Sequence, residues 1–282
     1  MYKPISSNME HGTHAIRKST SLSCLQRSII DSYSTDYLKE AASKGIGYLN
    51  ANRNEAKAVA RNPNINFMLD NQAIKDFFYS AHPSVLYFFA GNNSAINIVG
   101  IEGVEYLLKK SYKIRRKLAK TVSIVQMKDD HNISYVDRLL NDKSPKVRCA
   151  VYSNAHAIKY IKLKDIVNQL EFGPIQNKIA LASNEAIPSI LGLYHLMPLI
   201  VRSQNVQVRM AAASNYFMVL RLGKSANELL NDSNDGVIEA LLKNNAYIPD
   251  YPKLHILARK SRHPKIRELV TSYLAFNNMR RR

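Results

Sequence analysis

The sequence contains no tryptophan and only two cysteines, and these absences exclude several classes of protein. Cys24 and Cys149 lie far apart, so we expect neither a disulfide framework nor a thiolate metal cluster, and a reducing cytoplasm suits the chain best. A Gly-rich phosphate loop, a His-Glu-x-x-His motif and a Cys-x-x-Cys motif are also missing. The eight histidines show no zinc spacing. The sequence therefore favours a protein that is not an enzyme and needs no cofactor.

Long apolar runs are missing as well. The longest, residues 186–201, is interrupted by Pro188, His195 and Pro198. A membrane span needs about 20 apolar residues, so this run is too short. The first thirty residues contain no apolar core of the signal-peptide type. We therefore expect a soluble cytoplasmic protein that makes no contact with a membrane.

Positive charge is in large excess. Lysine and arginine number 40 against 22 acidic residues, which gives a formal net charge of +18. The hydrophobic share of 46% is ordinary for a folded protein. Like charges repel one another, so such an excess usually serves an anionic partner. The expected partner is nucleic acid, DNA rather than RNA, or an acidic protein; a basic protein without such a partner is the plainer alternative.

A pattern of roughly 30 residues repeats along most of the chain. Residues 145–154 recur as residues 175–184 and 206–215, each with small residues in the middle and Ser-Asn at the end. One position in each copy advances in steps of 29 to 33 residues: Val85, Ile114, Val147, Asn177, Val208, Val237 and Ile266. A second, apolar segment keeps the same step, so each unit is expected to contain two helical pieces.

The residues at both ends of the first helical piece fit a helix. Pro145, Pro174 and Pro264 stand where a helix begins, and Ser144 is a plausible N-cap. Asparagine closes the piece in five copies, where it tolerates the left-handed conformation and can bond local backbone. We favour this structural role over a ladder that reads a ligand. The five asparagines are Asn92, Asn154, Asn184, Asn215 and Asn244.

This pattern resembles HEAT-like repeats, and more closely the variant leucine-rich (LRV) repeat. The shared features are Val-Arg near the start of a helix, a small-residue centre, an asparagine and an apolar second helix, over residues 52–278. The resemblance implies an all-α, right-handed α-solenoid of about seven to eight repeats. It also implies one repeat domain over 26–278 with an N-terminal cap at 26–51, between a flexible tail (1–25) and a basic tail (279–282). The cysteine cluster that accompanies some LRV repeats is absent, so we infer no iron–sulfur centre.

A column of cations follows the repeated position by one residue. Its members are Arg115, Arg148, Lys178, Arg209 and Arg267. In stacked repeats these side chains would lie in register, which suits a run of phosphates. The alternative is an internal ladder in which the cations pair with aspartates, for which Asp142 and Asp232 are available. The sequence leaves both open.

Cations are also dense in two segments, residues 109–120 and 253–267. A solvated helix face explains either segment alone, whereas the two together with the column favour a shared anion-binding track. The candidate nucleic-acid contacts are Lys109, Lys110, Lys113, Arg115, Arg116, Lys117, Arg148, Lys178, Arg209, Arg259, Lys260, Arg262, Lys265 and Arg267.

Three functions fit these observations. The first is backbone-directed nucleic-acid binding without catalysis, and the second is a scaffold for an acidic protein. The third comes from the resemblance alone, since HEAT-like folds include the alkylpurine DNA glycosylases; those use tryptophan prominently, and this chain has none. Asp129, Asp130 and His131 form the single acid–histidine cluster, which a surface insertion explains, and we expect no metal there.

Overall fold

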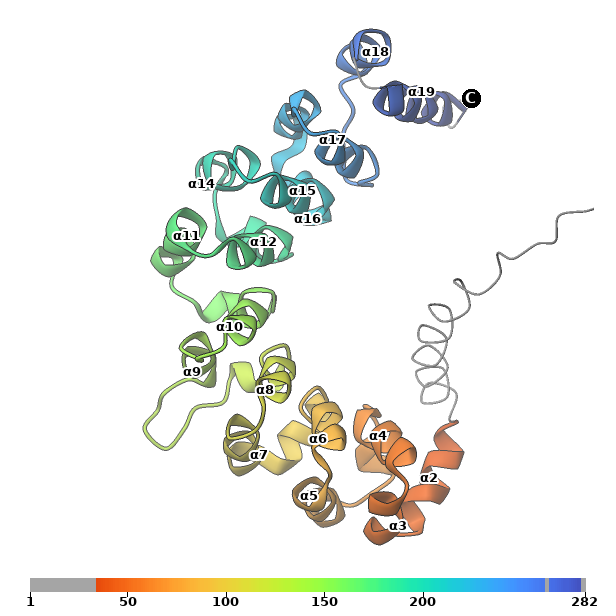
Figure 1. Cartoon of the computed structure of the whole chain (residues 1–282), viewed down its shortest axis with the longest axis vertical. Helices are drawn as coiled ribbons and strands as arrows, with labels where there is room; N and C mark the ends of the chain where they lie inside the picture. Colours follow the sequence, from red (N-terminus) through yellow and green to blue (C-terminus); the bar gives the residue numbers. More distant parts are fainter. Residues whose placement is uncertain (1–33, 262–263, 280–282) are drawn as a thin grey trace, which may run out of the picture. The chain divides into compact units, whose positions relative to one another are not determined.

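The computed structural model describes residues 34–261 and 264–279 (Figure 1). The described part is all-helical and contains no strand, so the predicted all-α class is confirmed at that level. No helix within these residues is both long and apolar enough to cross a membrane. The expected N-terminal tail, residues 1–25, and the arginines at 280–282 lie outside the described residues.

The chain divides into two compact units between Leu107 and Leu108. In the first unit α2 and α6 both pack against α4, and α3 packs against α5. Whether these two units form the single repeat domain expected over residues 26–278 is not tested by this division, so that domain stays a prediction. The helices of the first unit are α2 (Thr35–Ser43), α3 (Ile46–Ala51), α4 (Arg53–Arg61), η1 (Ile65–Phe67), α5 (Asn71–Ser80), α6 (Pro83–Phe89) and α7 (Asn93–Leu108).

In the second unit the first helix of each repeat packs against the first helix of the next. The order is α8, α10, α12, α15, α17 and α19. Figure 1 draws α9, α11 and α14 in a second row beside them. The helices of this unit are α8 (Tyr112–Leu118), η2 (Ser123–Val125), α9 (Tyr135–Leu140), α10 (Pro145–Tyr152), η3 (Ala157–Tyr160), α11 (Leu163–Phe172), α12 (Ile175–Ser183), α13 (Ile187–Ile190), α14 (Leu193–Leu196), η4 (Met197–Val201), α15 (Val206–Ser214), α16 (Tyr216–Leu222), η5 (Gly223–Asn231), α17 (Asp235–Leu242), α18 (Tyr251–Lys260) and α19 (Pro264–Met279).

The repeated position of the sequence lies in the core. All seven of its residues are in helices and are at most 5% exposed. The apolar segments between them are also helical, in α5, α7, α9, α11, η4, η5 and α18. One of these, η4, is a π-helical turn that contains Pro198. Proline has no N–H to donate to the preceding turn, which is a known cause of such local irregularity. The expected pair of helical pieces is therefore confirmed.

The helices begin at or next to the predicted prolines, but the predicted N-cap hydrogen bond of Ser144 does not form. Pro145 and Pro264 begin α10 and α19, whereas Pro174 is the N-cap residue just before α12. Ser144 is the N-cap of α10, but its hydroxyl makes no capping bond. The Ser144 N–H instead donates to the Asp142 carboxylate at 2.7 Å. The aspartate thus organises this turn, which the sequence had assigned to the serine.

The five asparagines link each repeat to the one before it. The Asn215 side chain donates to the carbonyls of Ala182 and Asn184, both at 3.0 Å, and its Oδ1 accepts the Met218 N–H. Asn154 does the same with the carbonyls of Ala119 and Thr121. Asn92, Asn184 and Asn244 also each donate to a backbone carbonyl 31 or 32 residues earlier. The structural role is confirmed, and each such bond stabilises the fold by about 1 kcal/mol.

The conformation expected for these asparagines was wrong. Among the described residues other than glycine, only Asn132 has a positive φ. Asn184 and Asn215 instead have extended backbone, with φ of −76° and −77°. The role of these side chains is therefore to satisfy helix-end carbonyls of the preceding repeat, which need hydrogen-bond donors once they are buried.

Candidate functional site

The first member of the cation column, Arg115, is buried. Its Nε and Nη2 donate to the two carboxylate oxygens of Asp142 at 2.6 and 3.0 Å, and its Nη1 donates to the Lys110 carbonyl. The side chains of this pair are 9% and 8% exposed. A paired guanidinium at this depth cannot leave its carboxylate for a phosphate without exposing two buried charges. At Arg115 the structure therefore forms the internal ladder with Asp142, and a contact with nucleic acid at this residue stays a prediction.

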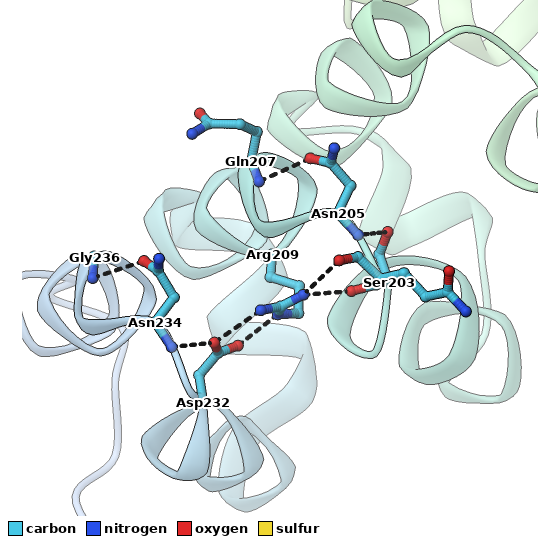
Figure 2. A network of polar contacts seen from close by, with 8 residues as sticks. Ser203, Asn205, Gln207, Arg209, Asp232, Asn234 and Gly236 are labelled. Atoms are coloured by element: carbon cyan, nitrogen blue, oxygen red, sulfur yellow. Dashed lines mark hydrogen bonds and ion pairs between the residues drawn. The ribbon is translucent and has the colours of Figure 1, made fainter.

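Arg209, in α15, repeats this geometry (Figure 2). Its Nε and Nη2 donate to Asp232 at 2.5 and 2.9 Å, and its Nη1 donates to the Ser203 carbonyl at 2.7 Å. The Asp232 carboxylate also accepts the Asn234 N–H at 2.9 Å. Arg209 is thus also paired with an aspartate, and its contact with nucleic acid stays a prediction. At these two positions the internal ladder that the sequence left open is the arrangement that forms.

The other three members of the column bind backbone carbonyls. Arg148 donates to the Asp142 carbonyl, Lys178 to that of Glu171 and Arg267 to that of Ser261, at 2.6, 2.6 and 2.8 Å. In all five cases the acceptor lies five to seven residues earlier, at or near the end of the preceding helix. Helix ends present carbonyls without partners and a negative partial charge. The column therefore caps the C-terminal ends of the preceding helices, and of its five members only Arg267 is exposed.

The second dense segment, residues 253–267, is partly neutralised. Lys253 pairs with Asp250 at 3.5 Å, and Lys265 pairs with Glu239 at 2.8 Å. Hydrogen bonds from Lys243 and Lys265 lower the pKa of Glu239 to about 2. Arg259 is exposed, the structure describes only the backbone of Lys260, and Arg262 lies outside the described residues. Among the described side chains of this segment, Lys253 and Lys265 are therefore paired with carboxylates.

The first dense segment does form an open positive face, together with α10. Tyr112, Arg116 and Lys120 follow one another at i, i+4 and i+8, so they lie along one side of α8 and the turn after it. Lys146 projects from the first turn of α10, with its Nζ 5.6 Å from the centre of the Tyr112 ring. This distance is within the range of a cation–π interaction, which holds Lys146 towards α8.

These side chains line a cleft of about 700 Å³ between α8, α10 and α12. None of its lining residues is acidic, and none comes from α9 or α11. The lining residues are Tyr112, Arg116, Lys120, Ser144, Pro145, Lys146, Cys149, Ala150, Ser153, Pro174, Gln176 and Asn177. Within the part of the chain that the structure describes, no carboxylate forms an ion pair with Arg116, Lys120 or Lys146. A carboxylate, Glu185, lines an adjoining hollow that Lys120 also borders.

The pKa of the Cys149 thiol is affected by the positive charges of the cleft. Burial raises its pKa, and the charges of Arg116 and Lys120 partly oppose this rise. Both cations therefore lie close enough to the thiol to affect its ionisation. The Cys149 Sγ also lies 3.4 Å from the Gln176 carbonyl oxygen, across the α10–α12 boundary.

The remaining candidates of the first segment lie beside this cleft and do not line it. Lys109 and Lys113 are exposed, whereas Lys110 and Lys117 are half-buried. Two of the three cleft cations, Lys120 and Lys146, were not among the sequence candidates. A signal for Lys120 was present, because Lys113, Arg116 and Lys120 are spaced i, i+3 and i+7 and so share one helix face. Lys146 could be found only from the packing of α10 against α8.

The acid–histidine cluster lies in the loop between η2 and α9. Asp129 accepts the backbone N–H groups of His131 and Ile133 and pairs with Arg138 at 3.5 Å. Among the described residues, no group of three or more histidine, cysteine or acidic side chains is placed to hold a metal ion. The Asp129 carboxylate therefore organises this loop through its hydrogen bonds to the backbone.

Comparison with known proteins gives no family assignment. The sequence matches no family model, and no significant similarity to a curated protein is found.

Proposed function

We propose that the chain binds nucleic acid without catalysis, through the cleft between α8, α10 and α12. The observation that carries the proposal is the convergence of Arg116, Lys120 and Lys146 on a cleft without acidic lining residues. DNA is the partner we favour, contacted through its phosphates, in the reducing cytoplasm that the scarcity of cysteine suits.

The charge around the cleft supports this proposal. The segment 109–120 contains seven cations and no carboxylate. Arg115 is neutralised internally by Asp142, whereas Arg116 and Lys120 are exposed on the neighbouring face. Exposed cations that lack counterions repel one another, and this repulsion is relieved when a polyanion binds and releases its own counterions.

We further propose that the repeats form a right-handed α-solenoid of the HEAT-like or LRV-like type. The support is the one-repeat spacing of the asparagine bonds and the stepwise packing of α8, α10, α12, α15, α17 and α19. A solenoid would present the first helices as an extended surface on which the cleft lies.

The salt dependence of oligonucleotide binding tests the proposed function. Three phosphate contacts to a single strand predict a slope of about −2 in a plot of log affinity against log salt concentration. The affinity should then fall roughly twentyfold between about 50 and 200 mM salt. Fluorescence anisotropy with a labelled oligonucleotide measures the slope. A slope near zero, or no binding at about 50 mM salt, would contradict the proposal.

A further inference from the structure

The cleft combines its three cations with apolar and aromatic surface. Tyr112, which is 37% exposed as a residue, contributes an aromatic ring, and Pro145, Ala150 and Pro174 contribute aliphatic atoms. A site that only follows phosphates needs no such surface, because a backbone contact is satisfied by charge and hydrogen bonds alone. The apolar lining therefore favours a ligand that has an apolar part next to its negative charge.

The size of the cleft limits that ligand. Pockets of about 300–1,000 Å³ enclose a single small molecule, and this cleft of about 700 Å³ falls within that range. A nucleotide unit is of this kind, since it joins a flat base to a phosphate. The cleft is too small to admit a duplex, whose bases are stacked inside and cannot reach Tyr112.

The aromatic and apolar residues of the cleft lie apart from two of its cations. Tyr112 and Pro145 lie at the first turns of α8 and α10, whereas Arg116 and Lys120 follow one and two turns later along α8. The Lys146 ammonium lies 5.6 Å from the Tyr112 ring centre, next to the aromatic part. A base placed at Tyr112 would have its phosphate beside cations.

We propose that the cleft binds one unstacked nucleotide of a single strand, and that the protein therefore prefers single-stranded nucleic acid to duplex. This inference rests on the proposed function and adds the strandedness of the ligand. Tyr112 and the two prolines contact the base, and Arg116, Lys120 and Lys146 contact the adjacent phosphates.

The test compares a single strand of about 12 thymidine nucleotides with a duplex of the same length, at one salt concentration, by fluorescence anisotropy. We expect the single strand to bind at least about tenfold more tightly, which is the contribution of one stacked base. Tyr112→Leu should lower the single-strand affinity by a similar factor and the duplex affinity by clearly less, since only the single strand loses a stacked base. Tyr112→Phe, which keeps the ring, should retain full affinity.

A matched control is Tyr160→Leu, because Tyr160 is 55% exposed on η3 and does not line the cleft. It should change neither affinity, and circular dichroism checks that each variant is folded. Equal or tighter binding of the duplex, or unchanged single-strand affinity in folded Tyr112→Leu, would overturn this inference and leave the proposed function standing. If neither oligonucleotide binds, both are wrong.

Discussion

Replacing Arg116, Lys120 and Lys146 together by glutamine is expected to lower the affinity for a single-stranded oligonucleotide about 100-fold at roughly 0.1 M salt. Each phosphate contact to a single strand contributes about 0.7 to the slope against log salt, and hence about a factor of five at this concentration. Three contacts multiply to about 100. The slope itself should fall from about −2 towards zero. Anisotropy titrations at several salt concentrations measure both quantities.

The control for this variant removes the same charge elsewhere in the second unit. Lys159, Lys162 and Lys164 are all exposed, lie at η3 and the start of α11, and do not line the cleft. Replacing these three by glutamine lowers the net charge equally and should change affinity by less than about fivefold, through long-range potential alone. Equal losses in the two triple variants would mean that overall charge, and not the cleft, determines binding.

The Asp142→Asn variant is expected to lower the free energy of unfolding by about 3 kcal/mol or more at neutral pH. The change keeps the shape of the side chain but leaves the Arg115 guanidinium buried without its counterion. Removing one partner of a buried ion pair costs about 3–5 kcal/mol. The side chains of this pair are 9% and 8% exposed, so solvent screens them little. Chemical denaturation followed by circular dichroism measures the loss.

An exposed ion pair in the same unit provides the comparison. Arg202 binds Glu228 with two hydrogen bonds of 2.9 Å, but these side chains are 61% and 44% exposed. Glu228→Gln should therefore cost less than about 1 kcal/mol. If the two variants lose equal stability, burial does not determine the strength of the Arg115–Asp142 pair.

The effect of Asp142→Asn also has a defined pH dependence. Burial alone would raise the pKa of Asp142, but hydrogen bonds from Arg115 and the Ser144 N–H outweigh it, so the pKa lies below its ordinary value of 3.8. A carboxyl group with a lowered folded-state pKa stabilises the protein above its unfolded-state pKa, and this contribution is lost as the pH falls through the folded-state pKa. The difference between wild type and variant should therefore be full above about pH 5 and shrink below pH 3.8.

The sequence predicts the helices and the burial of the recurring position well, because both depend on local pattern. Burial at the repeated position and helix breaks near proline and asparagine recur at a fixed step, so each copy supports the others. The partners of the asparagines were harder to predict. Their acceptors lie about one repeat earlier, as with Asn215 and Ala182, and only the packing of neighbouring repeats brings them together.

The sequence does not predict which cations are buried and which line the cleft. Arg115 and Arg116 are adjacent in a segment rich in cations, yet one is buried against Asp142 and the other is exposed in the cleft. A turn of about 100° per residue in a helix separates them, and the sequence does not show which of the two faces inward. The carboxylate that decides it lies 27 residues away. Lys146 joins the cleft for the same reason, through contact between helices of successive repeats.

The rate of alkylation of Cys149 tests the central claim most directly, because this thiol lies inside the cleft. In a Cys24→Ser background Cys149 is the single thiol, and mass spectrometry follows its reaction with iodoacetamide with and without a single-stranded oligonucleotide. At about ten times its Kd the oligonucleotide should slow the reaction roughly tenfold, because most clefts are then occupied. The protection should disappear in the Arg116, Lys120 and Lys146 triple variant. An unchanged rate while anisotropy shows saturated binding would place the nucleic acid elsewhere and contradict the account.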